Sequence, residues 1–522
     1  MTANNKVRQC INFLLQHYIL LIIVGLSLSF RLYKISSWTF FGMDQEYEAF
    51  IIKNILSLKH FPLIGVNASD TGLYLGPAFI YIAAIPYYIF QGNPLGGAVF
   101  ASTLGILTTF MIYILGKEWF SKKVGLLASF FWAFSFISIL YDRQFWNPTP
   151  LSFLSIVILY SLTKIIRGQS NHFIFLGLSL GLALQSHLQA VVFLPIVIFF
   201  LTKYRTRYTK KYLLIFLLIL LIFQLPLILF DLRHNFTNSK ALIALISQNQ
   251  DAAKTYTTPM MDKLSLFTNI IGRSFYIASQ ADLYAENGQC NELMPYVGKT
   301  NILVIIIIFC LLGYFLYQSL IKRNKEIKDF GIILSIFVIT FLGIILYSRP
   351  IFEYYLLYFL PILYLAIAWV LIFFLRKEFK YFIVSLTILF ALINMKTFFT
   401  AKMSFTHKDK VSAMKFAKKY VERNNFNFEV LGECSKFGGY RYLLEYLAQK
   451  PGSSYMDSYF SWLYGAPMKK KYPKSLIFSV IDQRERNSYQ KWKKIESDYK
   501  RRMTANAQFG NIRVMVVNNE NN

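Results

Sequence analysis

The chain has 522 residues, of which 55% are apolar, 18% aromatic and 16% charged, and its formal net charge is +28. In a soluble protein this charge would favour nucleic-acid binding, but here the basic residues lie between long apolar runs, as the positive-inside rule expects. The runs have the length that a hydrocarbon core of ~30 Å requires of a helix. We therefore predict a polytopic α-helical membrane protein with no role in nucleic-acid binding.

The first apolar run, residues 18–30, follows Lys6 and Arg8, which predicts an N-terminus in the cytoplasm. No small-residue cleavage site follows it, so we interpret it as an uncleaved first helix. The next stretch, FFGMDQEYEAFIIKNI at residues 40–55, is then expected to emerge outside the membrane.

This stretch places three carboxylates, Asp44, Glu46 and Glu48, within five residues. An acidic cluster beside the bilayer favours a functional site over a solvated loop, and we predict that Asp44 is a catalytic base. The pattern predicts an amphipathic helix over residues 45–58 in the membrane interface, with Glu46 on its polar side. Glu48 follows Asp44 by one turn and is expected to face the same site, binding a divalent ion or raising its neighbour's pKa.

Residues 74–90 are apolar enough to cross the membrane, but the basic loops argue against a crossing. The loops in question are residues 116–125, 205–211, 321–328 and 376–380. They lie in the cytoplasm only if residues 74–90 do not cross. Pro77 and Pro86 also interrupt the run, which favours a re-entrant or interfacial hairpin. We therefore predict a first external loop over residues 34–95 that contains this hairpin.

About eleven transmembrane helices are expected within a domain of residues 1–400, with the C-terminus outside. After the first, they cover residues 96–115, 126–140, 151–166, 173–184, 190–201, 212–230, 302–320, 331–347, 355–375 and 381–396. A long external loop is expected over residues 231–300.

Residues 401–522 are polar with mixed periodicity and predict a small extracytoplasmic α/β domain. Its expected helices and strands cover residues 408–423, 428–431, 440–449, 475–480 and 512–517. Cys290 and Cys434 are both expected outside, so a disulfide between them is left open.

Ionisable residues near the helix ends gather on the predicted external side, where a functional site is the first hypothesis. The candidate substrate- or phosphate-binding residues are Glu48, Asp70, Arg143, Asn147, His187, Arg233, His234, Arg349 and Glu353. The guanidinium of Arg143 suits a phosphate. Arg233 and His234 would either hold phosphate or anchor a helix end, and Arg349 and Glu353 would either bind substrate or pair with each other.

Structural interpretations compete for the other candidates. Asp70, in SDTGLYLGP, is equally suited to cap the next helix. Asn147 precedes a proline, which is an ordinary turn signal. His187 is more simply a hydrogen-bonded interfacial histidine than a residue that binds a metal or transfers a proton.

The acidic stretch, SDTGLYLGP, GKEWFSKKVG and YDRQFWNPTPLSF together resemble the GT-C fold glycosyltransferases that use polyprenyl-phosphate sugars. The resemblance covers about residues 18–361 and is nearest to bacterial family 39, with its protein O-mannosyltransferase-like and RgtA/B/C/D-like proteins. Such families have a catalytic Asp in the first external loop, which implies this role for Asp44. Many members have Asp-Glu there, whereas this chain has Asp44-Gln45, which leaves a second carboxylate and a metal unassigned.

The resulting hypothesis is a plasma-membrane hexosyl- or pentosyltransferase with its active site outside the cytoplasm. Asp44 would accept the proton of an acceptor hydroxyl, on a lipid, glycan or protein, in one inverting displacement, while positive charge holds the leaving phosphate. No cofactor is certain, and a divalent metal ion is left open.

The alternatives are a transporter or flippase of lipid-linked glycan, another GT-C-like envelope polymerase or ligase, and a non-catalytic protein that binds envelope components. A transporter would carry its charges near the bilayer midplane on broken helices.

Overall fold

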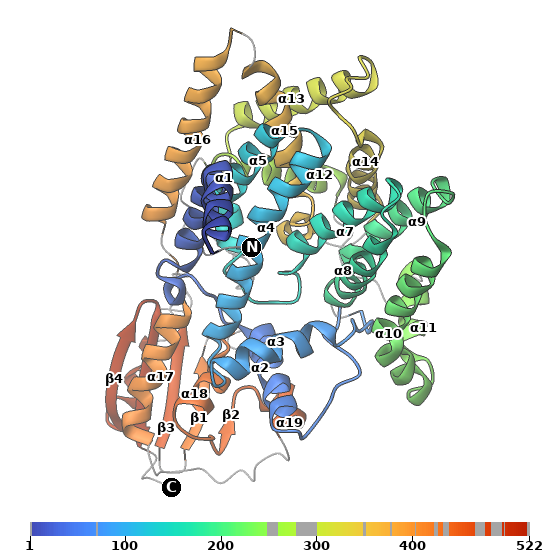
Figure 1. Cartoon of the computed structure of the whole chain (residues 1–522). Coiled ribbons are helices and arrows are strands. Elements are labelled where there is room, and N and C mark those ends of the chain that lie inside the picture. Colours follow the sequence, from blue (N-terminus) through green and yellow to red (C-terminus); the bar gives the residue numbers. More distant parts are fainter. Residues whose placement is uncertain are drawn as a thin grey trace.

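In the computed structural model, a bundle of apolar helices carries a small α/β domain at one end (Figure 1). The structure describes residues 3–68, 71–247, 259–277, 300–347, 351–375, 378–401, 403, 405–421, 426–431, 438–464, 475–481, 493–494 and 496–518. The bundle consists of α1 (Ala3–Leu32), α4 (Leu95–Trp119), α5 (Lys122–Phe134), α6 (Phe136–Tyr141), α7 (Leu151–Ile166), α8 (Phe173–Ser186), α9 (Phe193–Lys203), α10 (Lys210–Arg233), α13 (Ile302–Leu320), α14 (Phe330–Leu346), α15 (Leu360–Leu375) and α16 (Lys380–Thr400). Every span predicted from the sequence overlaps one or more of these helices, and residues 126–140 are divided between α5 and α6.

Four of these helices, α4, α10, α13 and α16, are long and apolar enough to cross a membrane. Other apolar helices of the described chain, among them α7, α14 and α15, are shorter. The eleven crossings therefore stay a prediction, whereas the apolar helical bundle itself is confirmed.

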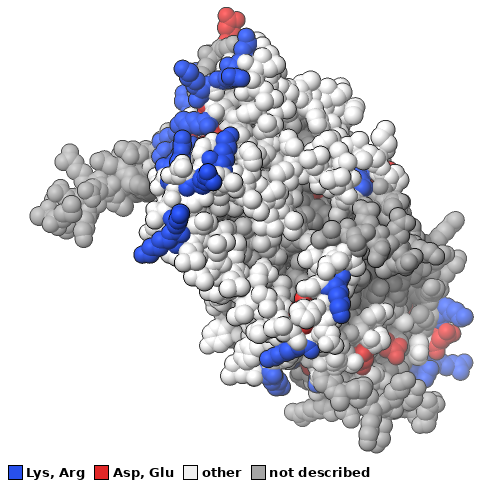
Figure 2. All heavy atoms as spheres, turned by 90° about the vertical axis from the view of Figure 1, so that its right-hand side faces the viewer, with Lys and Arg blue, Asp and Glu red and all other residues white. Residues whose placement is uncertain are grey.

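The turns after α4, α7, α9 and α13 lie together at one end of the bundle, which we call the basic end. Glu118 pairs there with Lys164 at 2.8 Å and with Arg167, which also pairs with Asp329. The exposed basic residues of this end are Lys117, Lys122, Lys123, Lys203, Arg205, Arg207, Lys210, Lys211, Lys322, Arg323, Lys325 and Lys328. Figure 2 shows Lys and Arg concentrated toward one end of the molecule beside a broad band with few charges. Loops 116–125, 205–211 and 321–328 of the charge argument thus lie together, whereas residues 376 and 377 of the fourth loop lie outside the described residues.

The opposite end, which we call the α2 end, carries α2 (Met43–Leu56) and α3 (Ala78–Ile89) side by side (Figure 1). α3 has 12 residues, or ~18 Å of helix, which is too short to cross a hydrocarbon core of ~30 Å. It packs against α2 and α4 instead, as expected for a hairpin within residues 34–95.

α2 differs from the interfacial helix expected over residues 45–58. It begins at Met43, and Glu46 is buried together with the apolar residues from Ala49 to Ile52. Phe50 and Ile52 belong to one hydrophobic core with Ala413 of the C-terminal domain. Lys53 and Ser57 are exposed, as expected for the polar side, whereas Glu46 is buried because the C-terminal domain covers the start of the helix.

The C-terminal domain has a sheet of strand order β2-β1-β3-β5-β4. Its elements are α17 (His407–Val421), β1 (Phe426–Leu431), α18 (Tyr440–Leu447), β2 (Ser453–Ser454), α19 (Asp457–Tyr464), β3 (Ser475–Ile481), β4 (Met503–Phe509) and β5 (Ile512–Asn518). β1 is parallel to β2 and β3, and β5 is antiparallel to β3 and β4. The α/β character and the five predicted elements are present, and α17 packs on the sheet through β5 and β4.

The stretch expected to be an external loop, residues 231–300, contains two helices, α11 (Thr237–Ser247) and α12 (Met260–Arg273). α12 has a markedly amphipathic pattern, which buries Phe267, Ile270 and Ile271 in the bundle core. The expected loop is therefore partly a packed helix. Cys290 and Cys434 lie outside the described residues.

Candidate active site at the α2 end

Asp44 lies in the first turn of α2 and is half-buried. The backbone N–H of Gly42 donates to Oε1 of Gln45 at 2.9 Å, which closes the start of the helix. Gln45 is therefore part of a helix cap and no second acid is needed at its position. Asp44 therefore lies at a helix N-terminus, where the partial positive charge of the helix attracts negative charge.

Glu48 follows one turn later and is fully buried, and neither of its carboxyl oxygens has a hydrogen-bond partner among the described residues. Burial raises the pKa of Glu48 well above its ordinary value, and the nearby charge of Asp44 raises it further. Glu48 is thus expected to be protonated at neutral pH. The two carboxyl groups of this turn therefore lie in different environments, one half-buried and one fully buried.

Tyr354, in the short 3-10 helix η5 (Glu353–Leu356), lies close enough to Asp44 to interact electrostatically with it. Its ring is 4.4 Å from that of Trp146 and 5.7 Å from that of His187, measured between centroids. The loops before α7, after α8 and before α15 therefore meet beside Asp44. Aromatic side chains dominate this meeting point.

His187 is buried, and burial lowers its pKa to about 3, so the imidazole is neutral at physiological pH. Its Nδ1 accepts from the backbone N–H of Gln189 at 3.4 Å. These features match the structural interpretation of His187, and a part in substrate binding stays a prediction.

Glu353 forms a buried ion pair with Arg273 of α12, at 2.7 Å. Arg349, the partner suggested by the sequence, lies outside the described residues, as does Asp70. The sequence analysis missed Arg273 because it treated residues 231–300 as a loop. The amphipathic run that ends at this arginine was the available signal.

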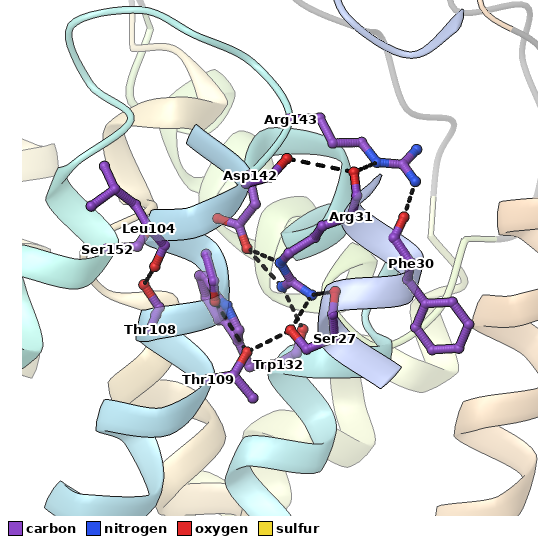
Figure 3. A network of polar contacts seen from close by, with 12 residues as sticks. Ser27, Phe30, Arg31, Leu104, Thr108, Thr109, Trp132, Asp142, Arg143 and Ser152 are labelled. Atoms are coloured by element: carbon purple, nitrogen blue, oxygen red, sulfur yellow. Dashed lines mark hydrogen bonds and ion pairs between the residues drawn. The ribbon is translucent and has the colours of Figure 1, made fainter. Parts of the chain in front are cut away.

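The sequence predicts that Arg143 contacts phosphate, whereas its hydrogen bonds in the structure are internal. Its guanidinium donates to the carbonyl oxygens of Phe30 and Arg31, the latter at 3.0 Å (Figure 3). It also donates to the carbonyl oxygen of Tyr33 at 3.1 Å. It also lies over the ring of Trp38, with 5.2 Å from Cζ to the ring centroid. Arg143 therefore caps the C-terminal end of α1.

Its neighbours on both sides hold the same segment. Asp142 forms a buried ion pair with Arg31 at 2.6 Å, and Figure 3 shows this pair in a network that extends to Ser27 and Thr109. Gln144 accepts from the N–H of Phe40 and donates to the carbonyl of Trp38, both at 2.9 Å. Residues 142–144 thus fix the chain that leads from α1 to Asp44.

The remaining candidates are distributed around the same end. Asn147 donates to the carbonyl of Ser186 at 2.8 Å, which joins the loop before α7 to the end of α8. Arg233 and His234 are exposed at the end of α10, and the His234 ring stacks on Phe230 at 4.2 Å. His234 therefore anchors the helix end, while a phosphate contact stays a prediction for both residues.

A small hydrogen-bond network joins the segment before α3 to the end of α10. Asp231 accepts from the N–H groups of Asn238 and Ser239 at 2.7 and 3.0 Å. The Asn238 amide accepts from the N–H of Tyr74 at 2.6 Å and donates to its carbonyl at 3.1 Å. Arg233 and His234 therefore lie next to the loop that includes Tyr74.

No group of three His, Cys, Asp or Glu side chains suited to a metal ion occurs within the described ranges. Asp44 and Glu48 are two carboxyl groups on one turn, but Glu48 is held in its neutral form and metal ligands must be ionised. No chemical step is assigned to a divalent ion.

Comparison with known proteins identifies the architecture. Residues 75–230 match the sequence model of the family described as dolichyl-phosphate-mannose-protein mannosyltransferase. The structure of ArnT from Cupriavidus metallidurans, bound to undecaprenyl phosphate, superposes with a TM-score of 0.56 at 11% identity, covering 99% of this chain and 98% of that one. The chain has the GT-C fold.

A second GT-C neighbour is the oligosaccharyltransferase of Archaeoglobus fulgidus, solved with Zn and sulfate. Its TM-score is 0.52 at 14% identity, covering 88% of this chain and 68% of that one. No curated protein sequence matches the chain significantly. The family match begins after α2 and does not include Asp44. A role for Asp44 therefore rests on its position in the structure.

Proposed function

We propose that this protein transfers a sugar from a polyprenyl phosphate to an acceptor hydroxyl, at the α2 end of the bundle and on the extracytoplasmic side of the plasma membrane. The GT-C fold and the family match support this class of donor, since ArnT is described with undecaprenyl phosphate and the matched family with dolichyl-phosphate-mannose. The acceptor is a lipid, glycan or protein that reaches this end of the molecule.

The position of Asp44 carries the proposal. It is the half-buried carboxylate at the N-terminus of α2, where the loops before α7 and before α15 meet. A base must be ionised, and Glu48 is held protonated by burial, which leaves Asp44 to accept the acceptor's proton. The acceptor oxygen then attacks the anomeric carbon in one step and inverts it.

The leaving phosphate departs as an anion and needs positive charge more than a proton. Arg233 and His234 are exposed at this end, and Arg273 is buried beside Glu353. We include Arg273 among the candidate phosphate contacts, together with Arg349, and leave out Arg143 because its guanidinium caps α1.

The test uses the full-length protein in lipid nanodiscs with a panel of radiolabelled polyprenyl-phosphate sugars and a membrane extract as acceptor source. The wild type should consume at least one donor, and Asp44→Asn should reduce the rate by at least about a hundredfold. Asp498→Asn, a matched change at an exposed carboxylate of the C-terminal domain, should leave the rate unchanged. Consumption of no donor, or normal consumption by Asp44→Asn, would contradict the proposal.

A further inference from the structure

α2 has a second side, turned away from the proposed chemistry and covered by the C-terminal domain. The rings of Phe41 and Phe50 lie 6.0 and 5.3 Å from that of Tyr442, between centroids. Both phenylalanines share a buried core with Leu443 and Ala413. The first external segment is therefore built into the hydrophobic core of a domain that begins more than 350 residues later in the chain.

Backbone groups just before Asp44 are bonded to this domain. The fully buried Nζ of Lys410, on α17, donates to the carbonyl of Phe41 at 2.8 Å and to that of Gly438 at 2.7 Å. The N–H of His407 donates to the carbonyl of Thr39 at 2.9 Å. One ammonium group thus holds the chain before Asp44 against the loop before α18.

A side chain just after Asp44 is bonded to the same domain. Glu46 is fully buried, and its Oε1 accepts from the backbone N–H of Tyr442 at 2.8 Å. Gly439 has a φ of +66°, and a Cβ there would lie 2.4 Å from the carbonyl oxygen of Phe41. The close approach between the two segments therefore requires glycine at this position.

Stability alone does not require a lysine at position 410, because a well-packed apolar side chain is often as stabilising as a buried charge. The two hydrogen bonds that Lys410 donates instead fix the distance between the carbonyl groups of Phe41 and Gly438. Such contacts determine position, and a displacement of ~1 Å at a reacting group can lower a rate about a hundredfold.

We propose that the C-terminal domain is a positioning part of the active site, in which Lys410 and Glu46 hold the chain on both sides of Asp44 and so place its carboxylate. Neither residue touches substrate; both act through α2. This inference rests on the proposed role of Asp44 as the base.

The test compares Lys410→Met with wild type, full-length and in nanodiscs. We expect kcat to fall about ten- to a hundredfold with the donor KM within about twofold, because the change displaces Asp44 without touching the donor. Amide hydrogens of residues 43–48 should exchange faster, while those of α4 and α7 should not change. Lys415→Met, at an exposed position of the same helix, should behave like wild type.

A second pair of variants covers the case in which Lys410→Met fails to fold. Glu46→Gln keeps an oxygen acceptor for the N–H of Tyr442, whereas Glu46→Leu removes it. The glutamine variant should keep kcat within about threefold of wild type and the leucine variant should lose about tenfold or more.

Wild-type kcat and exchange in Lys410→Met, or equal kcat in the two Glu46 variants, would overturn the positioning role. Either result alongside an inactive Asp44→Asn would leave the proposed function intact. An active Asp44→Asn would instead refute the role of Asp44 as the base. Amide hydrogen exchange of residues 43–48 in Lys410→Met would still decide whether the C-terminal domain positions α2.

Discussion

Asp44 and Glu48 illustrate how burial gives two carboxyl groups on one helical turn different chemistry. Asp44 is half-buried at a helix N-terminus, whereas Glu48 is fully buried with no hydrogen-bond partner in the described residues. A helix N-terminus attracts negative charge to the position of Asp44, whereas burial raises the pKa of Glu48 well above its ordinary value. The pair therefore has one group able to accept a proton at neutral pH.

A base that acts only in the transition state has a particular kinetic signature. Asp44→Asn should lower kcat and kcat/KM together, by about a hundredfold or more, and leave the donor KM within about threefold. Initial rates over a range of donor concentrations measure both constants. A raised KM with an unchanged kcat would mean that Asp44 binds the donor and does not act as the base.

Glu46 predicts how stability depends on pH. Burial raises its pKa from 4.5 to about 7, while the hydrogen bond from Tyr442 and the charges of Arg441 and Lys410 act in the opposite direction. The folded state binds this proton more tightly than the unfolded state, so stability is full below pH 4.5 and is lost as pH rises through 7. The shift corresponds to about 3 kcal/mol.

Glu46→Gln removes this titration. Between pH 5 and pH 8 the wild-type Tm should fall more than the Tm of the variant, and thermal unfolding followed by intrinsic fluorescence in detergent measures the difference. Equal falls in the two proteins would show that Glu46 does not titrate in this range.

At the scale of elements, the end of α1 is held by residues 142–144 through bonds that are all internal. Arg31 and Asp142 form the central pair, and Gly105 leaves room for it, since a Cβ there would lie 2.3 Å from the Asp142 carboxyl group. The pair joins α1 to the segment between α6 and α7. The start of the Asp44 segment is thereby fixed to the bundle.

Asp142→Asn should destabilise the protein by about 3–5 kcal/mol, because it leaves the Arg31 charge buried without its partner. The double variant Arg31→Met with Asp142→Leu should lose less, since no uncompensated charge remains. Glu496→Gln, which weakens a partly exposed pair with Arg513 at 3.7 Å, should cost less than about 1 kcal/mol. Chemical unfolding in detergent compares the three, and a double variant less stable than Asp142→Asn would contradict this account.

The helices were predictable because hydropathy and length are local properties of a sequence. The hairpin stays a prediction, which rests on the parity that the basic loops 116–125 and 205–211 impose on the chain and agrees with the short length of α3. The internal role of Arg143 was not predictable, because it depends on carbonyl groups more than 100 residues away. The same holds for the burial of Glu46, whose partner Tyr442 is 396 residues distant. Periodicity says which side of a helix is polar, but not whether another domain covers it.

At the scale of the whole molecule, the two ends of the bundle predict a topology. His60 lies exposed in the hairpin near the α2 end and Lys123 lies exposed at the basic end. In a background without the four natural cysteines, His60→Cys should react with a membrane-impermeant maleimide from outside the cell, and Lys123→Cys only after the membrane is opened. Reaction of both from the same side would refute the predicted placement of residues 34–95.

The C-terminal domain that covers α2 also sets an order of events during biosynthesis. Phe41 is made long before Lys410, which follows it by 369 residues, and translation at ~5–20 residues per second separates the two by about 20–70 s. During that interval Phe41, Phe50 and Ile52 lack the cover that the C-terminal domain gives them, so a nascent chain exposes more apolar surface to chaperones or lipid. A ribosome that stops before α17 would therefore release a membrane-inserted protein with its carboxylates present and its sugar transfer absent.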